Sequence, residues 1–160
     1  MANYNSYKNS SDNRYQGENR YEQKTNINKC EPLNKKTYVE QAEKVIQRLK
    51  DNPDHKKLSK TEKLTTSKIR NILSMLNKIY NDVIMSPENK LSGDVQNQLQ
   101  YMKVKLIYAA GRHKSVNIFI KESHILEYLD DINDDKDAFI LYSRYMEALV
   151  AYHRFYGGAE

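Results

Sequence analysis

The chain has 160 residues, of which 39% are hydrophobic, and it carries a formal net charge of +5. This length suits one domain with a real core but not two, and the positive charge favours an acidic partner. The single cysteine, Cys30, excludes an internal disulfide and is typical of a reducing compartment. No apolar run approaches the roughly 20 residues of a membrane span. We therefore expect a soluble cytoplasmic protein that makes no membrane contact.

The N-terminal region differs in composition from the rest of the chain. Residues 1–28 consist mainly of Asn, Tyr, Ser, Gln and mixed charges, with few aliphatic side chains. Such a segment buries too little apolar surface to offset its ordering entropy. We assign residues 1–36 to a disordered, Asn- and Tyr-rich tail and residues 37–158 to the folded domain.

Apolar residues then recur every three or four positions, which is the pattern of amphipathic helices. A first helix over residues 37–50 ends at DNPD, and a second begins at LTTSKIR, with Thr65 or Thr66 as its N-cap, and stops before Pro87. Ser92 caps a third helix, in which Gly111 marks either the C-terminus or a point of close packing. The predicted core stripes are Tyr38, Ala42, Val45, Ile46 and Leu49; Ile69, Leu73, Leu76, Tyr80 and Val83; and Val95, Leu99, Met102, Leu106 and Ala109.

A fourth helix is expected near residues 116–129. After the linker DDINDDKD, Asp134 or Asp135 caps the last helix, AFILYSRYMEALVAYHRFY, which is apolar nearly all round and is therefore expected at the centre. No strand-like alternation is present. The predicted fold class is all-α, a compact bundle of about five helices preceded by the disordered polar N-terminal tail.

Acidic residues are missing from two long stretches. Residues 63–81 and 95–121 contain several Lys and Arg residues but no Asp or Glu. Acidic residues are instead concentrated in residues 122–137. A solvated helix normally mixes signs, because opposite charges one turn apart stabilise it slightly. The uneven distribution therefore indicates a surface that meets a polyanion.

Helical spacing gathers the bases into two faces. Lys and Arg neutralise phosphates, and Ser, Asn and Tyr donate to phosphate or ribose oxygens. Neither face offers the aromatic platform of base-stacking proteins, so the pattern predicts a surface that follows a nucleic-acid backbone without reading its sequence. The residues of the two faces are Tyr101, Lys105, Tyr108 and Arg112 on the third helix, and Ser67, Arg70 or Asn71, Ser74, Asn77 or Lys78, and Asn81 on the second; Lys114 adds a further cation.

Arg112 has a second interpretation. It follows YAAG, where small residues let helices approach, so it is either RNA-binding or a structural arginine paired with Glu147 or Asp131. Glu147 itself is interpreted as an internal ion-pair partner of Arg144 rather than as a general base.

No catalytic or metal-binding pattern is present. The four histidines, His55, His113, His124 and His153, lack metal-ligand spacing, and neither a phosphate-binding loop nor a Cys–His pair occurs. Arg144 and His153 superficially resemble the arginine–histidine motif of helical ribonucleases, but the gap between them is too long. We expect no enzymatic activity, no cofactor and no metal.

At LTTSKIR, YMKVKLIYAAGR and YMEALVAYHRFYGG the chain resembles the small subunit of type III-A CRISPR effector ribonucleoproteins, the Csm complex. The resemblance implies a non-catalytic helical subunit that stacks in several copies as an inner filament. It also implies contacts with guide RNA and target RNA, with the backbone subunits and with the large polymerase-like subunit. The basic positions of the family carry over to Lys68, Arg70, Lys103, Lys105 and Arg112, with Arg144 and Arg154 flanking the third motif.

Head-to-tail stacking of copies needs two complementary surfaces. The acid-rich residues 122–137 and a basic end of the neighbouring copy would supply them. Two alternatives remain open: a helical adaptor whose basic face binds an acidic protein, and a helical ribonuclease that depends on His153.

Overall fold

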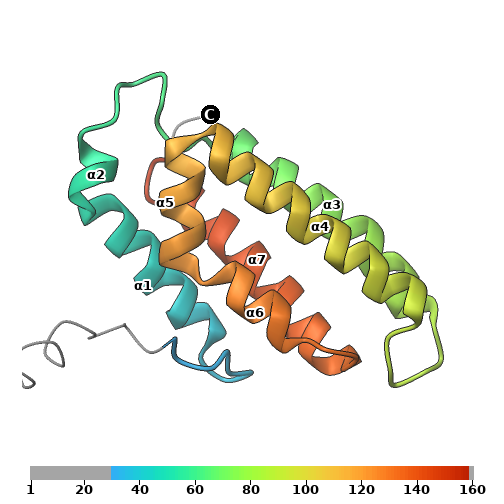
Figure 1. The fold of residues 1–160 in the computed structure, drawn as a ribbon. Helices are drawn as coiled ribbons and strands as arrows, with labels where there is room; N and C mark the ends of the chain where they lie inside the picture. The colour runs from blue at the N-terminus through green and yellow to red at the C-terminus, as the bar shows by residue number, and fades with distance from the viewer. Residues whose placement is uncertain (1–29, 159–160) are drawn as a thin grey trace, which may run out of the picture.

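The computed structural model describes residues 30–158, which form seven α-helices and no β-strand (Figure 1). The predicted all-α fold class is confirmed. The count exceeds the predicted five because a short helix follows Asn52 and because the predicted fourth helix is divided in two. The helices are α1 (Tyr38–Asp51), α2 (Pro53–Lys56), α3 (Thr66–Met85), α4 (Gly93–Arg112), α5 (Lys114–Ser123), α6 (Ile125–Asp131) and α7 (Lys136–Phe155).

His124 divides the predicted fourth helix into α5 and α6. Its backbone lies in the left-handed region, at φ 53° and ψ 26°, where histidine is more common than most non-glycine residues. Two tyrosine hydroxyls of α7 donate to carbonyl oxygens at the break, Tyr145 to Ser123 at 2.8 Å and Tyr142 to Ile125 at 3.2 Å. The break is thus stabilised by side chains from a helix distant in sequence.

Short polar side chains begin the long helices, as predicted. The hydroxyl of Thr65 accepts from the Lys68 amide, and that of Ser92 accepts from the Val95 amide, both at 3.2 Å. Asp135 accepts from two amides in the first turn of α7. Each cap satisfies donors that the first helical turn leaves without a backbone partner.

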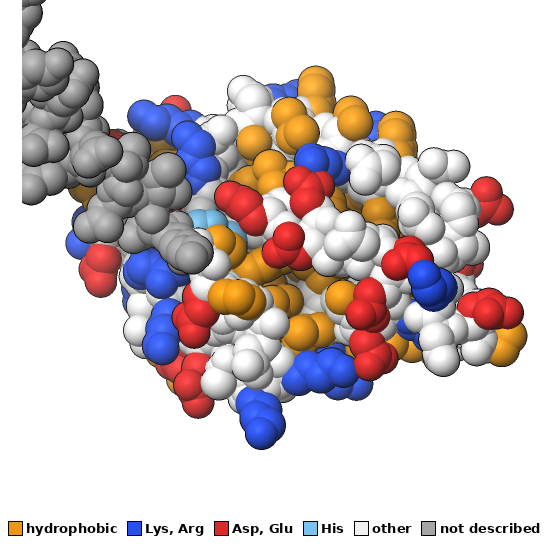
Figure 2. All heavy atoms as spheres, turned by 60° about the horizontal axis from the view of Figure 1, so that its bottom comes forward, with side chains coloured by type: hydrophobic (Ala, Val, Ile, Leu, Met, Phe, Trp, Pro, Cys, Tyr) orange, Lys and Arg blue, Asp and Glu red, His pale blue; other side chains and the backbone are white. Residues whose placement is uncertain are grey.

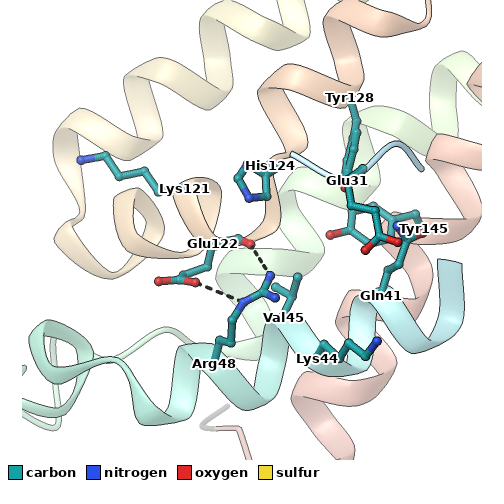
Figure 3. Close-up of a pocket in the computed structure, with 10 residues that line it drawn as sticks. All are labelled: Glu31, Gln41, Lys44, Val45, Arg48, Lys121, Glu122, His124, Tyr128 and Tyr145. Carbon is teal, nitrogen blue, oxygen red and sulfur yellow. Dashed lines mark hydrogen bonds and ion pairs between the residues drawn. The ribbon is translucent and has the colours of Figure 1, made fainter. Parts of the chain in front are cut away.

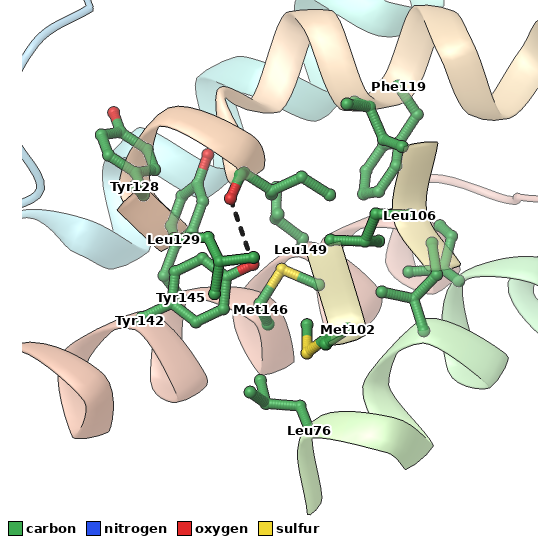
Figure 4. Packing of buried hydrophobic residues seen from close by; sticks show 14 of the residues in the cluster. Leu76, Met102, Leu106, Phe119, Tyr128, Leu129, Tyr142, Tyr145, Met146 and Leu149 are labelled. Carbon is green, nitrogen blue, oxygen red and sulfur yellow. Dashed lines mark hydrogen bonds between the residues drawn. The ribbon is translucent and has the colours of Figure 1, made fainter. Parts of the chain in front are cut away.

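The helices are arranged in two layers (Figure 1). In one, α7 packs between α1 and α3; in the other, α5 and α6 follow one another between α1 and α4, and α4 lies beside α3. The expectation that the last helix is central is confirmed, because Phe139, Tyr142, Tyr145, Met146 and Leu149 of α7 are all buried. Figure 4 shows this core, where Leu76, Met102 and Leu106 meet Met146 and Leu149.

All three predicted core stripes need correction. On α1, Tyr38 is half-buried. On α3, Ile72 and Ile79 are buried while Leu73 and Tyr80 are half-buried, because α3 packs against both α4 and α7 and its buried face is shifted. On α4, Ala109 is half-buried. Gly111 is the penultimate residue of α4, and a Cβ there would contact nothing within 4 Å, so it lies near the helix end, as one alternative predicted, and is not a point of close packing.

Residues 1–29 of the predicted tail lie outside the described residues. The described part of that range, residues 30–36, packs on the domain: Cys30 and Leu33 are half-buried against the core. The Gln41 side chain donates to the Pro32 carbonyl, and the Tyr128 hydroxyl donates to the Glu31 carbonyl. These residues therefore extend the folded domain on its N-terminal side.

Candidate nucleic-acid interface

The acid-free faces of α3 and α4 meet at one groove, which we call the α3–α4 groove. It has a volume of about 440 Å³. Its lining consists of Met75, Lys78 and Ile79 from α3 and Asn97, Gln98, Tyr101 and Met102 from α4. The two faces that the sequence predicted separately therefore meet at Lys78 and Tyr101.

The α3 side of this surface carries available positive charge. Arg70 and Lys78 are exposed, as are Asn71, Ser74 and Asn77. Within the described residues, Arg70 and Lys78 form no hydrogen bond or ion pair. Their charges are therefore not neutralised by the fold.

The α4 side is the predicted stripe of Tyr101, Lys105, Tyr108 and Arg112, and all four side chains are exposed. The Lys105 ammonium nitrogen lies 4.9 Å from the centroid of the Tyr101 ring, within the range of cation–π contacts. The Tyr101 side chain, and to a smaller extent Tyr108, raises the pKa of Lys105 above its usual value. Lys105 is thus a protonated cation held against an aromatic ring.

Arg112 ends α4 and is exposed. Within residues 30–158 it forms no hydrogen bond or ion pair, neither with Glu147 nor with Asp131. The interpretation of Arg112 as a structural arginine is therefore wrong. The expected ion pair between Arg144 and Glu147 is also absent from this part of the chain, and both side chains are exposed.

Two other predicted cations are engaged within the fold. Lys103 forms an ion pair with Asp130 of α6, at 2.6 Å, and Lys68 donates to the Lys63 carbonyl at 3.0 Å. These two lysines are therefore less available to a ligand than Arg70, Lys78 and Arg112. Lys114 is exposed, and its charge contributes, after hydrogen bonds from Ser59, to holding the pKa of Glu62 below its usual value.

Arg144 and Arg154 lie elsewhere. Both are exposed on α7, whereas Arg70 and Lys78 lie on α3 and Lys105 and Arg112 on α4. The structure therefore brings together only part of the predicted set.

The acid-rich residues 122–137 are largely paired with bases. Glu122 pairs with Arg48, Asp134 with Lys90 at 2.7 Å, and Asp137 with Lys35 at 2.9 Å, in addition to the pair of Asp130. Figure 2 shows red carboxylates interspersed with blue and orange side chains on the face in view. This stretch is therefore not a continuous anionic patch.

A second cavity, of about 390 Å³, lies between α1 and the α5–α6 break (Figure 3). Residues of both charges line it, namely Lys44, Arg48 and Lys121 together with Glu31 and Glu122. Arg48 donates to the Glu122 carbonyl and pairs with its carboxylate. This cavity therefore lacks the single-signed lining of the α3–α4 groove.

His153, the residue on which a ribonuclease would depend, is 6% exposed. Its Nδ1 lies 3.3 Å from the Thr66 hydroxyl, and burial, together with the nearby His55, lowers its pKa. A buried ring does not reach an RNA strand, so the ribonuclease alternative loses its candidate base. Among the described residues, no group of three or more metal-ligating side chains occurs, and no helix is long and apolar enough to cross a bilayer.

Sequence reasoning missed several residues of the groove and its surroundings. Met75, Asn97 and Gln98 line it, and Val104 and Ile107 are exposed beside the Tyr101 stripe. The exposure of Val104 and Ile107 could have been predicted from the sequence, because a core stripe through Leu99, Met102 and Leu106 leaves positions 104, 107 and 108 on the outer side of α4.

Comparison with known proteins supplies independent information. The sequence profile of the Csm2 type III-A family matches residues 39–159. The chain is 39% identical over 120 residues to the CRISPR system Cms protein Csm2 of Enterococcus italicus, which covers 72% of this chain and 86% of that protein. It is 39% identical over 129 residues to the Streptococcus thermophilus protein of the same name, covering 80% and 98%. The Mycobacterium tuberculosis protein of that name is 35% identical over 92 residues, covering 58% and 74%.

Proposed function

The chain belongs to the Csm2 family of type III-A CRISPR systems, and we propose that it is a non-catalytic, RNA-binding structural subunit of the effector complex. In this proposal, several copies stack as an inner filament in the cytoplasm. They lie beside the backbone subunits and the large polymerase-like subunit and contact the backbone of guide RNA and target RNA.

The observation that carries the RNA-binding proposal is the α3–α4 groove. Lys78 lines the groove. Arg70 on α3 and Lys105 and Arg112 on α4 add exposed positive charge to the acid-free faces of the two helices that form it. Exposed Asn and Ser side chains lie among them and can donate to phosphate and ribose oxygens. Such a surface binds a polyanion without a requirement for sequence.

Exposed apolar side chains at opposite ends of the bundle support head-to-tail stacking. The C-terminal end of α3 lies beside the start of α7, where Lys136 donates to the Ser86 carbonyl, and the other end of α7 reaches Thr66 through His153. Met85, 84% exposed, and Phe155, 77% exposed, are therefore at opposite ends. Two different terminal surfaces are what a head-to-tail contact requires.

A second candidate function, a helical adaptor for an acidic protein, is favoured by one observation. Val104 and Ile107 are exposed beside Lys105 on α4, and apolar side chains flanked by cations also suit a protein partner. The adaptor would bind through the same face as the RNA.

RNA binding by the purified full-length chain separates the two candidates. Fluorescence anisotropy with an unstructured RNA, between about 50 and 200 mM salt, should give a log–log slope of about −2 to −4, as expected for three to five neutralised phosphates. Unrelated RNA sequences should bind equally. A flat salt dependence, or no binding, contradicts the RNA proposal and leaves the adaptor.

A further inference from the structure

Two aromatic rings are exposed on the outer face of α4. Tyr101 is 62% exposed and Tyr108 is 65% exposed. Seven positions along a helix are two turns, so the two side chains leave the helix in the same direction about 10 Å apart. The core is complete without them, since Leu99, Met102 and Leu106 form the buried side of α4.

Cations alternate with these rings. Lys105 lies between them in sequence and contacts the Tyr101 ring, and Arg112 follows Tyr108 by one turn. The stripe therefore reads aromatic, cation, aromatic, cation along one line. This alternation matches single-stranded nucleic acid, in which bases and phosphates alternate in the same way.

The α3–α4 groove continues this stripe at Tyr101. Met75, Ile79 and Met102 give it apolar walls, and its volume of about 440 Å³ lies within the range of small-molecule sites. Asn97 and Gln98 lie at the groove, and within the described residues their side-chain amides form no hydrogen bond. An amide both donates and accepts, as the edges of nucleobases do.

We propose that α4 is a base-stacking platform for single-stranded RNA, with Tyr101 and Tyr108 each stacking an unpaired base and the α3–α4 groove holding the base at Tyr101. This inference rests on the proposed RNA-binding function and adds to it, because the faces were expected to contact the RNA backbone alone. It departs from the prediction that neither face offers an aromatic platform. The absence of acids from both faces suits a polyanion, and the alternation of rings and cations along α4 favours RNA over an acidic peptide.

The direct test compares two oligomers of equal length, an oligouridylate and its abasic ribose-phosphate counterpart, on the wild-type chain. Stacking of a single base should make the oligouridylate bind at least about fivefold more tightly, while both oligomers give the same salt slope. Equal affinity for the two overturns the platform but leaves backbone binding intact. Failure of both to bind overturns the proposed function itself.

Substitutions locate the effect. Tyr101→Leu with Tyr108→Leu should abolish the preference for the oligomer with bases and leave the salt slope unchanged, whereas Tyr101→Phe with Tyr108→Phe should retain the preference, because the rings remain. The chain has no tryptophan, so Tyr101→Trp provides a single reporter whose fluorescence the oligouridylate, but not the abasic oligomer, should quench. A preference that survives in the Leu variant, or an unquenched tryptophan, contradicts stacking at these positions.

Discussion

The ammonium nitrogen of Lys105 lies 4.9 Å from the centroid of the Tyr101 ring, one turn away on the same exposed face of α4. The contact orders a cation at the surface without neutralising it, because a tyrosine ring carries no negative charge. This distinguishes Lys105 from Lys103, whose ammonium is bound to the carboxylate of Asp130.

Lys105→Ala should therefore keep the fold and weaken RNA binding. Alanine is a better helix former than lysine, and no buried partner is left behind. The salt slope should fall by about one unit, as expected for one lost phosphate contact. Anisotropy titrations across salt concentrations measure this change. Lys103→Ala is the matched control, and it should leave the slope unchanged; an equal loss in both variants contradicts the assignment.

Arg112→Ala should leave stability within about 0.5 kcal/mol of the wild type, because the substitution removes an exposed side chain that no described residue pairs with. Urea unfolding followed by circular dichroism measures the difference. A loss of several kcal/mol would reinstate a structural role for Arg112.

Gly158→Ala should destabilise the domain by about 1–3 kcal/mol, because a Cβ at this position would overlap the His153 ring and its carbonyl oxygen. The Gly158 amide also donates to that carbonyl, at 2.8 Å. Gly111→Ala is the control: with open space around its Cβ position, it should stabilise α4 by about 0.5–1 kcal/mol. Thermal unfolding of the two variants should therefore move in opposite directions.

Stability should fall as the pH is lowered below about 6.5. Burial, and then the neighbouring His55, lowers the pKa of His153 below its usual value, and burial and Lys63 lower that of His55. Both histidines line a cavity of about 210 Å³, which Lys50 and Lys63 also line and to which no described carboxylate contributes. The unfolded chain therefore binds protons at a higher pH than the folded chain, so the free energy of unfolding decreases from the unfolded pKa down to the folded pKa.

Urea midpoints measured at about pH 7.5 and pH 5.5 check this sign. The wild type should have the lower midpoint at the acidic pH, and His153→Gln should show a smaller difference. A wild-type midpoint that does not change, or that rises on acidification, contradicts the burial of a neutral His153.

Local chemistry in the sequence predicted much of the fold. Thr65, Ser92 and Asp135 cap helices as expected, because a cap depends on residues within one turn. The α5–α6 break was not predictable in this way, because the carbonyl groups on either side of His124 accept hydrogen bonds from Tyr142 and Tyr145 of α7, which is distant in sequence. Likewise, Glu31 is held by Tyr128, a contact between distant parts of the chain.

The candidate site likewise combines features that depend on neighbouring residues with features that depend on contacts between distant helices. The exposed stripe from Tyr101 to Arg112 was predicted from helical spacing, which needs no partner helix. The groove required the packing of α3 against α4, which places Lys78 and Tyr101 on one surface. The pairing of Lys103 with Asp130 required the position of α6, so its charge was overestimated from sequence.

The most direct test of the RNA-binding surface compares two double variants that remove equal charge. Lys78→Ala with Arg112→Ala removes one exposed cation from α3 and one from α4, and Lys36→Ala with Lys60→Ala removes two exposed cations that lie outside these helices. The quantity measured is the slope of log affinity for unstructured RNA against log salt concentration. We predict that the first variant loses about two units of slope and the second loses none. Equal slopes in the two variants would show that RNA responds to net charge alone and would contradict an interface on α3 and α4.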